Sequence, residues 1–176
     1  SAEQQESLEG MLVTVEQALT VTDNYYLGRY GEVTLSNGRL YAPTNLHQPG
    51  SLEAALLAEV NKLNKLVLDD GNSRQNPADI IYPTGNLSAS NSLRLGDQVT
   101  QLTGILDYSY GKYRLVPTQA PEFVFANART DAPQLSATGN LRVASFNVLN
   151  YLNGDGQGAG FPTSRGADSM EEFVRQ

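Results

Sequence analysis

Short runs of β-forming residues, separated by turn residues, make up the first part of the chain. In the first run, Met11, Val13 and Val15 alternate with the positions between them, and the pattern changes phase near 17–18. An alternation with a period of two predicts a half-buried strand, and the change of phase predicts a kink. The predicted strands are 11–22, 25–35, 66–68, 98–110 and 112–116.

Glycine and asparagine mark the expected turns. Asn37-Gly38 is a strong hairpin signal, and residues 39–41 are the predicted start of the returning strand. Gly104 interrupts the longest β-forming run, which predicts a bulge or a sharp bend there. Gly111 predicts a tight hairpin between the last two strands of the series.

One segment has helical rather than β periodicity. Ser51 is a residue type that caps helices, and it precedes apolar positions that fall on a single helical stripe. The stripe consists of Leu52, Leu56, Val60 and Leu63. We therefore expect one short helix between the β-rich runs.

The region after residue 68 contains many turn-forming residues. Asp69-Asp70 could bind a cation, but such a pair more commonly ends a strand. Residues 72–95 are rich in Pro, Gly, Asn and Ser, and we expect them to form an excursion outside the core. Short bent strands, one short helix and long loops predict a mainly β protein, with a five-stranded OB-fold-like barrel as the best match.

The chain divides into four predicted segments. Residues 1–9 are a polar linker or terminal segment, and residues 10–118 form the OB-fold-like domain. Residues 119–139 are rich in Pro and small polar residues and are expected to be a linker, in which 123–125 docks on another surface. Residues 140–176 have the pattern of the first part of an α/β domain, which is truncated here.

This last segment begins with an apolar run, 141–151, that predicts a buried strand followed by a Gly-rich loop. The loop 154–159 fits a dinucleotide-binding pattern, but Gly160 and Pro162 prevent the helix that such a site needs, so a flexible loop is favoured. Residues 168–171 fit a capping box, which predicts the start of a short helix.

Composition limits the classes of function. The net charge of −7 and the pI of about 4.6 argue against a broad basic surface for nucleic acid, although a local basic stripe is compatible with them. The absence of Cys excludes disulfides and thiolate metal sites. No apolar run approaches the roughly 18–20 residues that span a bilayer. The only histidine, His47, lies in a predicted loop without companion ligands.

Aromatic and basic residues recur together on the predicted barrel strands. Aromatic rings stack on bases while Arg and Lys hold the backbone, which is how OB-folds bind single-stranded nucleic acid. This combination makes DNA or RNA a candidate partner. The candidate binding residues are Tyr26, Arg29, Tyr30, Tyr110, Lys112, Tyr113 and Arg114.

A structural explanation of the same tyrosines stays open beside the functional one. Some of the nine tyrosines could fill the barrel while the others cover its outside with their hydroxyls in water. The acidic net charge favours this second interpretation.

Taken together, several motifs resemble those of a known family. The chain is similar to large secreted bacterial nucleases in which an OB-fold domain precedes an endonuclease/exonuclease/phosphatase domain. The resemblance covers roughly residues 10–176. It depends on Leu68-Asp69-Asp70-Gly71, 96–99, 102–108, 113–115, Ala144-Ser145-Phe146-Asn147-Val148-Leu149-Asn150-Tyr151, 165–169 and 172–176.

The resemblance implies a metal-dependent phosphodiesterase for the full-length protein. Asn147 matches the family's Asn at the end of the first catalytic strand, where a neutral amide can orient a phosphate oxygen or a metal-bound water. Without the resemblance, the favoured interpretation of Asn147 is a residue that satisfies backbone groups at a strand end. The family's metal-binding Glu and its His and Asp residues belong to later strands, and the divalent cation is Mg²⁺ or Ca²⁺.

We therefore expect this chain to be inactive alone, with no cofactor of its own and no membrane partner. Its partners would be DNA or RNA and its own C-terminal nuclease domain, and the family implies an extracellular location. As an alternative, the barrel is a structural spacer that docks on the nuclease domain and binds no nucleic acid. A carbohydrate-binding barrel has no specific residue in its favour.

Overall fold

The computed structural model describes residues 5–130, 135, 139–141, 143–145 and 151–175. The chain forms two compact units, residues 1–131 and 132–176. The described part contains no helix that is both long and apolar enough to cross a bilayer.

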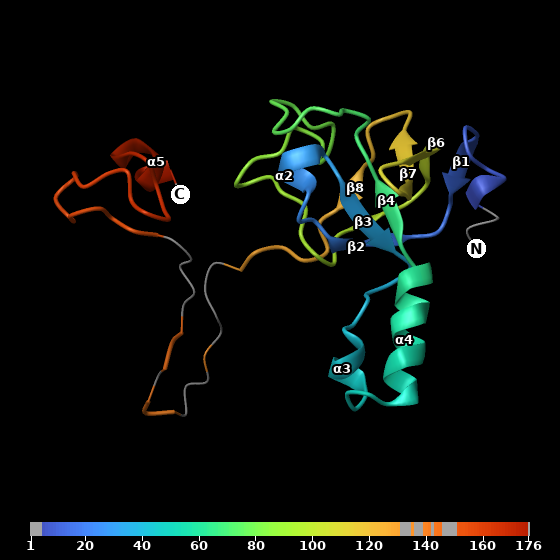
Figure 1. Cartoon of the computed structure of the whole chain (residues 1–176), viewed down its shortest axis with the longest axis horizontal. Coiled ribbons are helices and arrows are strands. Elements are labelled where there is room, and N and C mark those ends of the chain that lie inside the picture. Colours follow the sequence, from blue (N-terminus) through green and yellow to red (C-terminus); the bar gives the residue numbers. More distant parts are fainter. Residues whose placement is uncertain (1–4, 131–134, 136–138, 142, 146–150, 176) are drawn as a thin grey trace. The chain divides into compact units, whose positions relative to one another are not determined.

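The first unit is mainly β, as predicted, and its strands are linked in one mixed, eight-stranded sheet (Figure 1). The strand order is β1-β6-β7-β4-β3-β2-β5-β8. All neighbours are antiparallel except β4 and β7, which are parallel. The strands are β1 (Leu12–Val15), β2 (Leu19–Asp23), β3 (Val33–Ser36), β4 (Leu66–Leu68), β5 (Gln98–Val99), β6 (Leu102–Ser109), β7 (Lys112–Pro117) and β8 (Phe123–Val124).

The kink predicted near 17–18 separates β1 from β2. β1 pairs with β6, whereas β2 pairs with both β3 and β5. The β2 residues Leu19 and Val21 are buried in the core, and both strands that flank β2 contribute to the same cluster. The kink therefore lets one continuous segment take part in two regions of the sheet.

The segment 25–41 differs from the prediction of two strands joined by a hairpin. It contains the short helix α2 (Leu27–Tyr30), which ends at Gly31 with a φ of 69°, and then β3. No strand forms at 39–41, because β3 pairs with β4 instead. The backbone N–H and carbonyl of Asn37 both bond to the Asn64 side chain. These bonds tie the turn to the end of a distant helix rather than to a returning strand.

The hairpin between β6 and β7 forms as predicted. Tyr110 and Gly111 both have positive φ, 52° and 77°, as a two-residue turn with the twist of its strands requires. Of the two alternatives predicted at Gly104, a bulge or a sharp bend, the bulge is absent. Gly104 pairs in register with Val13 of β1, and it forms the last pair of the β6–β7 ladder with Pro117. A Cβ at Gly104 would lie 2.3 Å from the carbonyl oxygen of Val116. Glycine is therefore needed here for close approach of two backbones rather than for a bulge.

The long loop 72–95 was predicted to lie outside the core, and this prediction is wrong. Ile80, Tyr82 and Leu93 belong to the central hydrophobic cluster, and each is at most 4% exposed. The Tyr82 hydroxyl lies within hydrogen-bonding distance of the carbonyl oxygens of Gly31 and Leu68. Apolar burial thus offsets the entropy of ordering a segment with little regular structure.

The segment beyond residue 118 also contributes to the first unit. β8 pairs with β5, and Phe123 packs against the core with its ring 6.2 Å from that of Tyr82. The buried Asp97 carboxylate accepts hydrogen bonds from the backbone N–H groups of Arg94 and Asn127. The expectation that 123–125 docks on another surface is confirmed for β8.

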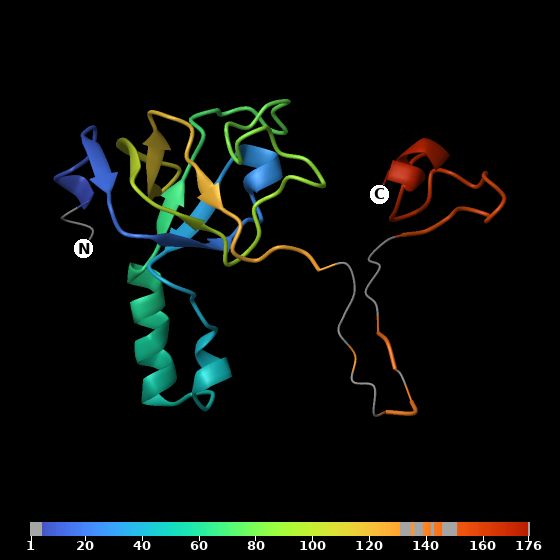
Figure 2. The same ribbon diagram turned by 180° about the vertical axis from the view of Figure 1, so that it is seen from behind.

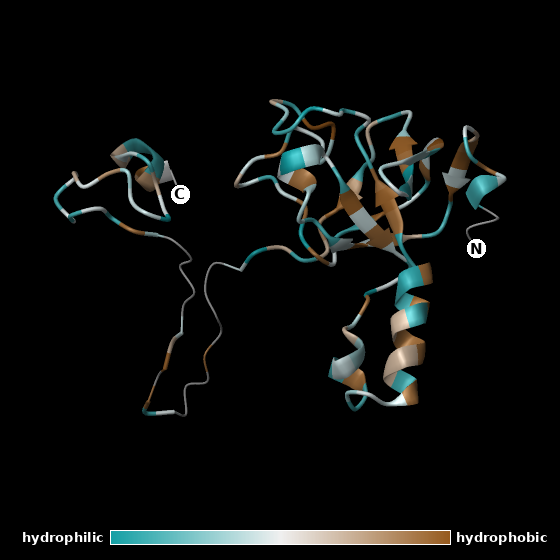
Figure 3. Cartoon of the chain, in the orientation of Figure 1, coloured by the Kyte–Doolittle hydropathy of each residue, from teal (hydrophilic) through white to brown (hydrophobic). Residues whose placement is uncertain are grey.

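Two helices extend beyond the end of the sheet, as Figures 1 and 2 show from opposite sides. They are α3 (Pro43–Leu46) and α4 (Leu52–Leu63). The predicted cap is confirmed, since the Ser51 hydroxyl accepts a hydrogen bond from the Ala54 N–H at 3.1 Å. The predicted stripe does not face the protein. Its exposed fractions are 71% for Leu52, 58% for Leu56, 58% for Val60 and 78% for Leu63, and Figure 3 shows the apolar residues along this helix.

The second unit contains the helix α5 (Met170–Arg175). Ser169 caps it by accepting from the Glu172 N–H, and the Glu172 carboxylate accepts from the Asp168 N–H, so the capping motif is confirmed one residue later than predicted. Leu141 and residues 143–145 belong to no strand. Asn147 and most of the predicted strand lie outside the described residues.

Candidate nucleic-acid interface

A cleft of about 820 Å³ lies in the first unit. The segment from Tyr26 to Glu32, which contains α2, the loop after β4 and the β6–β7 hairpin line it. It brings together nearly all the residues predicted to bind nucleic acid, although they come from two segments far apart in the sequence. The predicted residues that line it are Tyr26, Arg29, Tyr30, Tyr110, Lys112 and Arg114.

The α2 side of the cleft is aromatic. Tyr26 and Tyr30 lie one helical turn apart, with ring centroids separated by 5.6 Å. The Arg29 guanidinium lies 5.2 Å from the Tyr30 ring centroid and donates a hydrogen bond to Gln75 Oε1. Gln75 in turn donates to the Tyr30 hydroxyl, which joins helix and loop into one wall.

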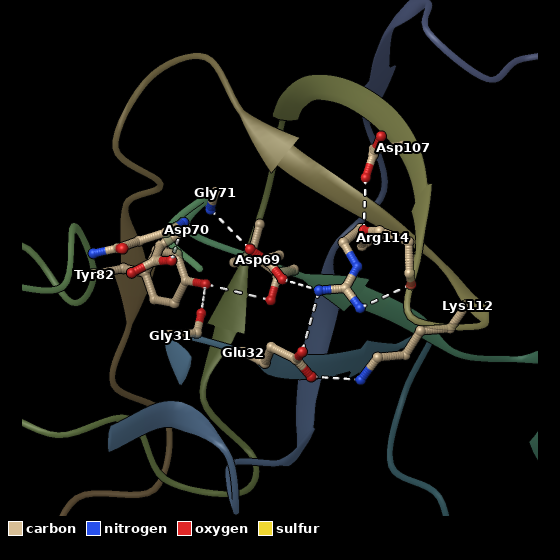
Figure 4. A network of polar contacts seen from close by, with 12 residues as sticks. Gly31, Glu32, Asp69, Asp70, Gly71, Tyr82, Asp107, Lys112 and Arg114 are labelled. Atoms are coloured by element: carbon tan, nitrogen blue, oxygen red, sulfur yellow. Dashed lines mark hydrogen bonds and ion pairs between the residues drawn. The ribbon is translucent and has the colours of Figure 1, made fainter. Parts of the chain in front are cut away.

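The hairpin side centres on Arg114, which is only 3% exposed. Its guanidinium pairs with Asp69, lies 3.2 Å from Glu32 Oε1, and donates to the Ser109 carbonyl at 3.0 Å (Figure 4). A buried guanidinium requires such partners, because desolvation of an unpaired charge is costly. Arg114 Nε is nevertheless buried without a hydrogen-bond partner among the described residues.

Glu32 links the two basic residues of β7. Its Oε2 lies 2.5 Å from Lys112 Nζ, while its Oε1 faces Arg114. Each cation also lies near an aromatic ring: Lys112 Nζ is 5.8 Å from the Tyr26 centroid, and Arg114 Cζ is 5.2 Å from that of Tyr110. Both positive charges are therefore already neutralised within the cleft.

Arg29 differs from the other two cations. Within the part of the chain that the structure describes, no carboxylate lies within salt-bridge distance of its guanidinium. Its hydrogen-bond partner is the neutral amide of Gln75. Of the three cations that line the cleft, Arg29 is thus the one whose charge can pair with an external anion without displacing a carboxylate of the described structure.

Tyr113 is the predicted residue that does not line the cleft. Its hydroxyl donates to Glu6 Oε2, and this bond raises its pKa to about 12. Its ring lies 4.8 Å from that of Tyr108, which is paired opposite it on β6. Adjacent strand positions face opposite sides, which separates Tyr113 from its neighbours Lys112 and Arg114.

The turn after β4 positions the acidic residues. Asp69 Oδ1 and Asp70 Oδ1 accept from the N–H groups of Gly71 and Asn72, so the predicted strand-ending turn is confirmed. Burial raises the pKa of Asp70, a hydrogen bond from Asn72 opposes this, and the nearby Asp69 charge adds to it. Burial, followed by the neighbouring carboxylates, also raises the pKa of Tyr82 well above its usual range.

The turn interpretation of Asp69 missed its second role as a partner of Arg114. Glu32 was not predicted to belong to the site at all. A paired charge of this kind leaves no local signal, because its partner is distant in the sequence. The acidic composition was a hint to such pairing, because basic residues in an acidic chain commonly form ion pairs with its carboxylates.

The described residues contain no group of three or more acidic or histidine side chains that could hold a metal ion. In the second unit, the Asp155 carboxylate accepts hydrogen bonds from the N–H groups of Gln157 and Ala159, which lower its pKa. Asp155 thus stabilises the turn of the loop in which it lies. No described residue is assigned as a metal ligand.

Comparison with protein families matches residues 2–128 to the family described as "Domain of unknown function (DUF8508)". The chain belongs to this family. The matched range contains every residue of the cleft, together with β8. Searches of curated proteins and of solved structures found no match.

Proposed function

We propose that the first unit is an accessory module of a metal-dependent nuclease and that its cleft binds single-stranded nucleic acid. The observation that carries this proposal is the convergence of Tyr26, Arg29, Tyr30 and the β6–β7 hairpin residues on one cleft. Aromatic rings beside cations in a groove are the elements by which proteins hold single strands.

The pairing pattern supports an OB-fold-like barrel as the scaffold. Segments 12–23 and 98–109 pair antiparallel at two places. β1 pairs with β6, with Leu12 opposite Ile105, and β2 pairs with β5, with Leu19 opposite Val99. The pairings β2–β3, β3–β4, β4–β7 and β7–β6 then lead from the first segment back to the second. If 12–23 and 98–109 each count as one bent strand, they form a closed ring of five strands with β3, β4 and β7, and this is the arrangement that we propose.

The wider assignment depends on the family resemblance of the second unit. In this proposal the full-length protein is secreted and hydrolyses phosphodiesters with Mg²⁺ or Ca²⁺, and Asn147 belongs to its active site. The metal and the acid–base chemistry belong to the catalytic domain as a whole, so no reaction step is assigned to residues of the first unit. We expect the present chain alone to leave DNA intact.

Fluorescence anisotropy with a labelled single strand of about ten nucleotides tests the binding role, since OB-folds cover sites of this order. The full chain should bind at low salt, and the Tyr26→Ala/Tyr30→Ala variant should bind at least about fivefold more weakly. Tyr41→Ala is the matched control, because Tyr41 also lies beside an arginine but not in the cleft. Absence of binding by the unaltered chain would refute the role.

A second candidate function is a spacer that docks on the nuclease domain. The exposed apolar stripe of α4 favours it, because leucines more than half exposed along one helix face form the kind of surface that proteins bury on association. The balanced charge of the cleft favours it as well.

The two functions make different predictions for the full-length enzyme. A nucleic-acid-binding module predicts that Tyr26→Ala/Tyr30→Ala raises KM for a single-stranded substrate. A spacer predicts an unchanged KM for that variant, whereas Leu52→Gln/Leu56→Gln lowers thermal stability of the full-length enzyme without affecting that of the isolated chain.

A further inference from the structure

The charges that line the cleft cancel one another. The lining cations are Arg29, Lys112 and Arg114, and the lining carboxylates are Glu32, Asp69 and Asp107. A groove that follows a phosphate backbone carries an excess of positive charge. This cleft has the aromatic residues of such a groove without that excess.

Glu32 occupies the position at which a phosphate would be expected. Its two oxygens contact Lys112 and Arg114 separately, as two phosphate oxygens would, and its side chain is 14% exposed. An incoming phosphate would have to displace this carboxylate or lie beside its negative charge. Either event removes most of the gain from contacting the two cations.

The aromatic surface is not blocked in this way. Tyr110 is 82% exposed at the tip of the hairpin, and Tyr26 is 44% exposed at the N-cap of α2. A cation lies near the ring of each, which restrains the ring and reduces the entropy lost when a base stacks on it. Base stacking is therefore the contact with nucleic acid that the cleft can form at the lowest cost in free energy, compared with contacts to phosphate.

We infer that the cleft recognises unpaired nucleobases rather than the phosphate backbone, with Arg29 neutralising a single phosphate and Glu32 excluding others from Lys112 and Arg114. This inference rests on the proposed binding function. It makes Glu32 the residue that sets the balance between base and backbone recognition.

The salt dependence of binding tests this inference. On a single strand, each neutralised phosphate contributes a slope of about −0.7 to a plot of log K against log [salt]. The unaltered chain should give a slope near that of one phosphate. Glu32→Gln keeps an oxygen near Arg114 but removes the charge, so it should tighten binding at low salt and steepen the slope by about 0.7 or more.

Glu59→Gln is the matched control, because it removes one negative charge from an exposed site on α4 outside the cleft. It should leave the slope unchanged. Arg29→Gln should nearly abolish the slope, whereas Arg39→Gln, outside the lining residues, should not. The Arg29 comparison does not require Glu32→Gln to fold.

A strand with abasic sites throughout distinguishes bases from backbone directly. It has the same phosphates as the intact strand, and we expect it to bind about tenfold more weakly or worse. Equal binding of both strands would overturn the inference, as would a slope for three phosphates in the unaltered chain, while leaving the proposed binding function in place. No binding of either strand at low salt would overturn both.

Discussion

In the cleft, Arg114 and Lys112 have carboxylate partners within the protein, whereas Leu52 and Leu63 of α4 are more than two thirds exposed. One surface has satisfied its polar groups internally, and the other leaves apolar groups in water. Removal of one partner from a buried ion pair destabilises the fold, because it leaves the other charge unpaired, and a pair that stays intact resists new charged ligands. Exposed leucines contribute little to stability, and most of their apolar surface becomes favourable only when a partner covers it.

This difference separates the residues that hold the fold from those available to a partner. Substitutions at the ionic centre of the cleft should act on the free energy of unfolding. Substitutions on the α4 stripe should act on association and leave unfolding unchanged.

Asp69→Ala should lower the free energy of unfolding by about 3 kcal/mol, because it removes one of the two carboxylates that pair with the buried Arg114 in the described structure. Urea denaturation measures the change. Asp107→Ala is the control, since Asp107 also lines the cleft but accepts only from the Ser109 hydroxyl in the described network. It should cost about 1 kcal/mol or less. Equal losses for the two variants would contradict the view that Arg114 is the ionic centre.

Ser51→Ala should lower stability by about 1 kcal/mol, because it removes the acceptor for the Ala54 N–H at the start of α4. Thermal unfolding followed by circular dichroism measures this loss. Ser51→Asp retains a capping oxygen and should stay close to the unaltered chain. A similar loss for Ser51→Asp would show that the capping bond is not the cause.

Asp70→Asn should produce a small increase in stability at neutral pH. Burial raises the pKa of Asp70, so its charged form costs free energy in the folded state. The gain should fade as the pH falls from the raised pKa of the folded state towards the usual pKa of Asp. Below the usual pKa the gain should be absent, because the folded and unfolded wild-type chains both carry the proton there.

Denaturation at several pH values measures this dependence, and the amide can still accept from the Asn72 N–H. A gain that grows as the pH falls would contradict the predicted sign. Asp69→Asn provides the opposite case, because it weakens the pair with Arg114 and should destabilise the fold at neutral pH.

Leu56→Gln should change the stability of the isolated chain by no more than about 0.5 kcal/mol, because this leucine is 58% exposed. Leu57→Gln is the control in the same helix, since Leu57 is half-buried and should lose about 1 kcal/mol or more. A large loss for Leu56→Gln would show that the stripe is already covered within this chain.

The elements that sequence reasoning predicted correctly are those with local causes. The Gly111 hairpin depends on two residues with positive φ, and the α4 cap depends on Ser51 and a neighbour three positions away. The strand at 66–68 and the kink near 17–18 likewise follow from adjacent residues. Local propensity and periodicity are sufficient for such features.

The predictions that failed required contacts between distant segments. No local pattern indicates that the loop 72–95 delivers Tyr82 and Leu93 to the core, because its composition is typical of exposed loops. The expected strand at 39–41 lost its partner when β3 paired with β4. At Gly104, the sequence indicated a special backbone position, but only the neighbouring strands show that it permits close approach.

The candidate site divides in the same way. Residue types alone indicated which side chains could stack on bases and which could carry a charge. The packing of strands and loops was needed to show that Tyr113 faces Glu6 outside the cleft, and that Glu32 joins Lys112 and Arg114. Charge pairing acts through space over a few ångströms, so its partners are chosen by how strands and loops pack and not by their order along the chain.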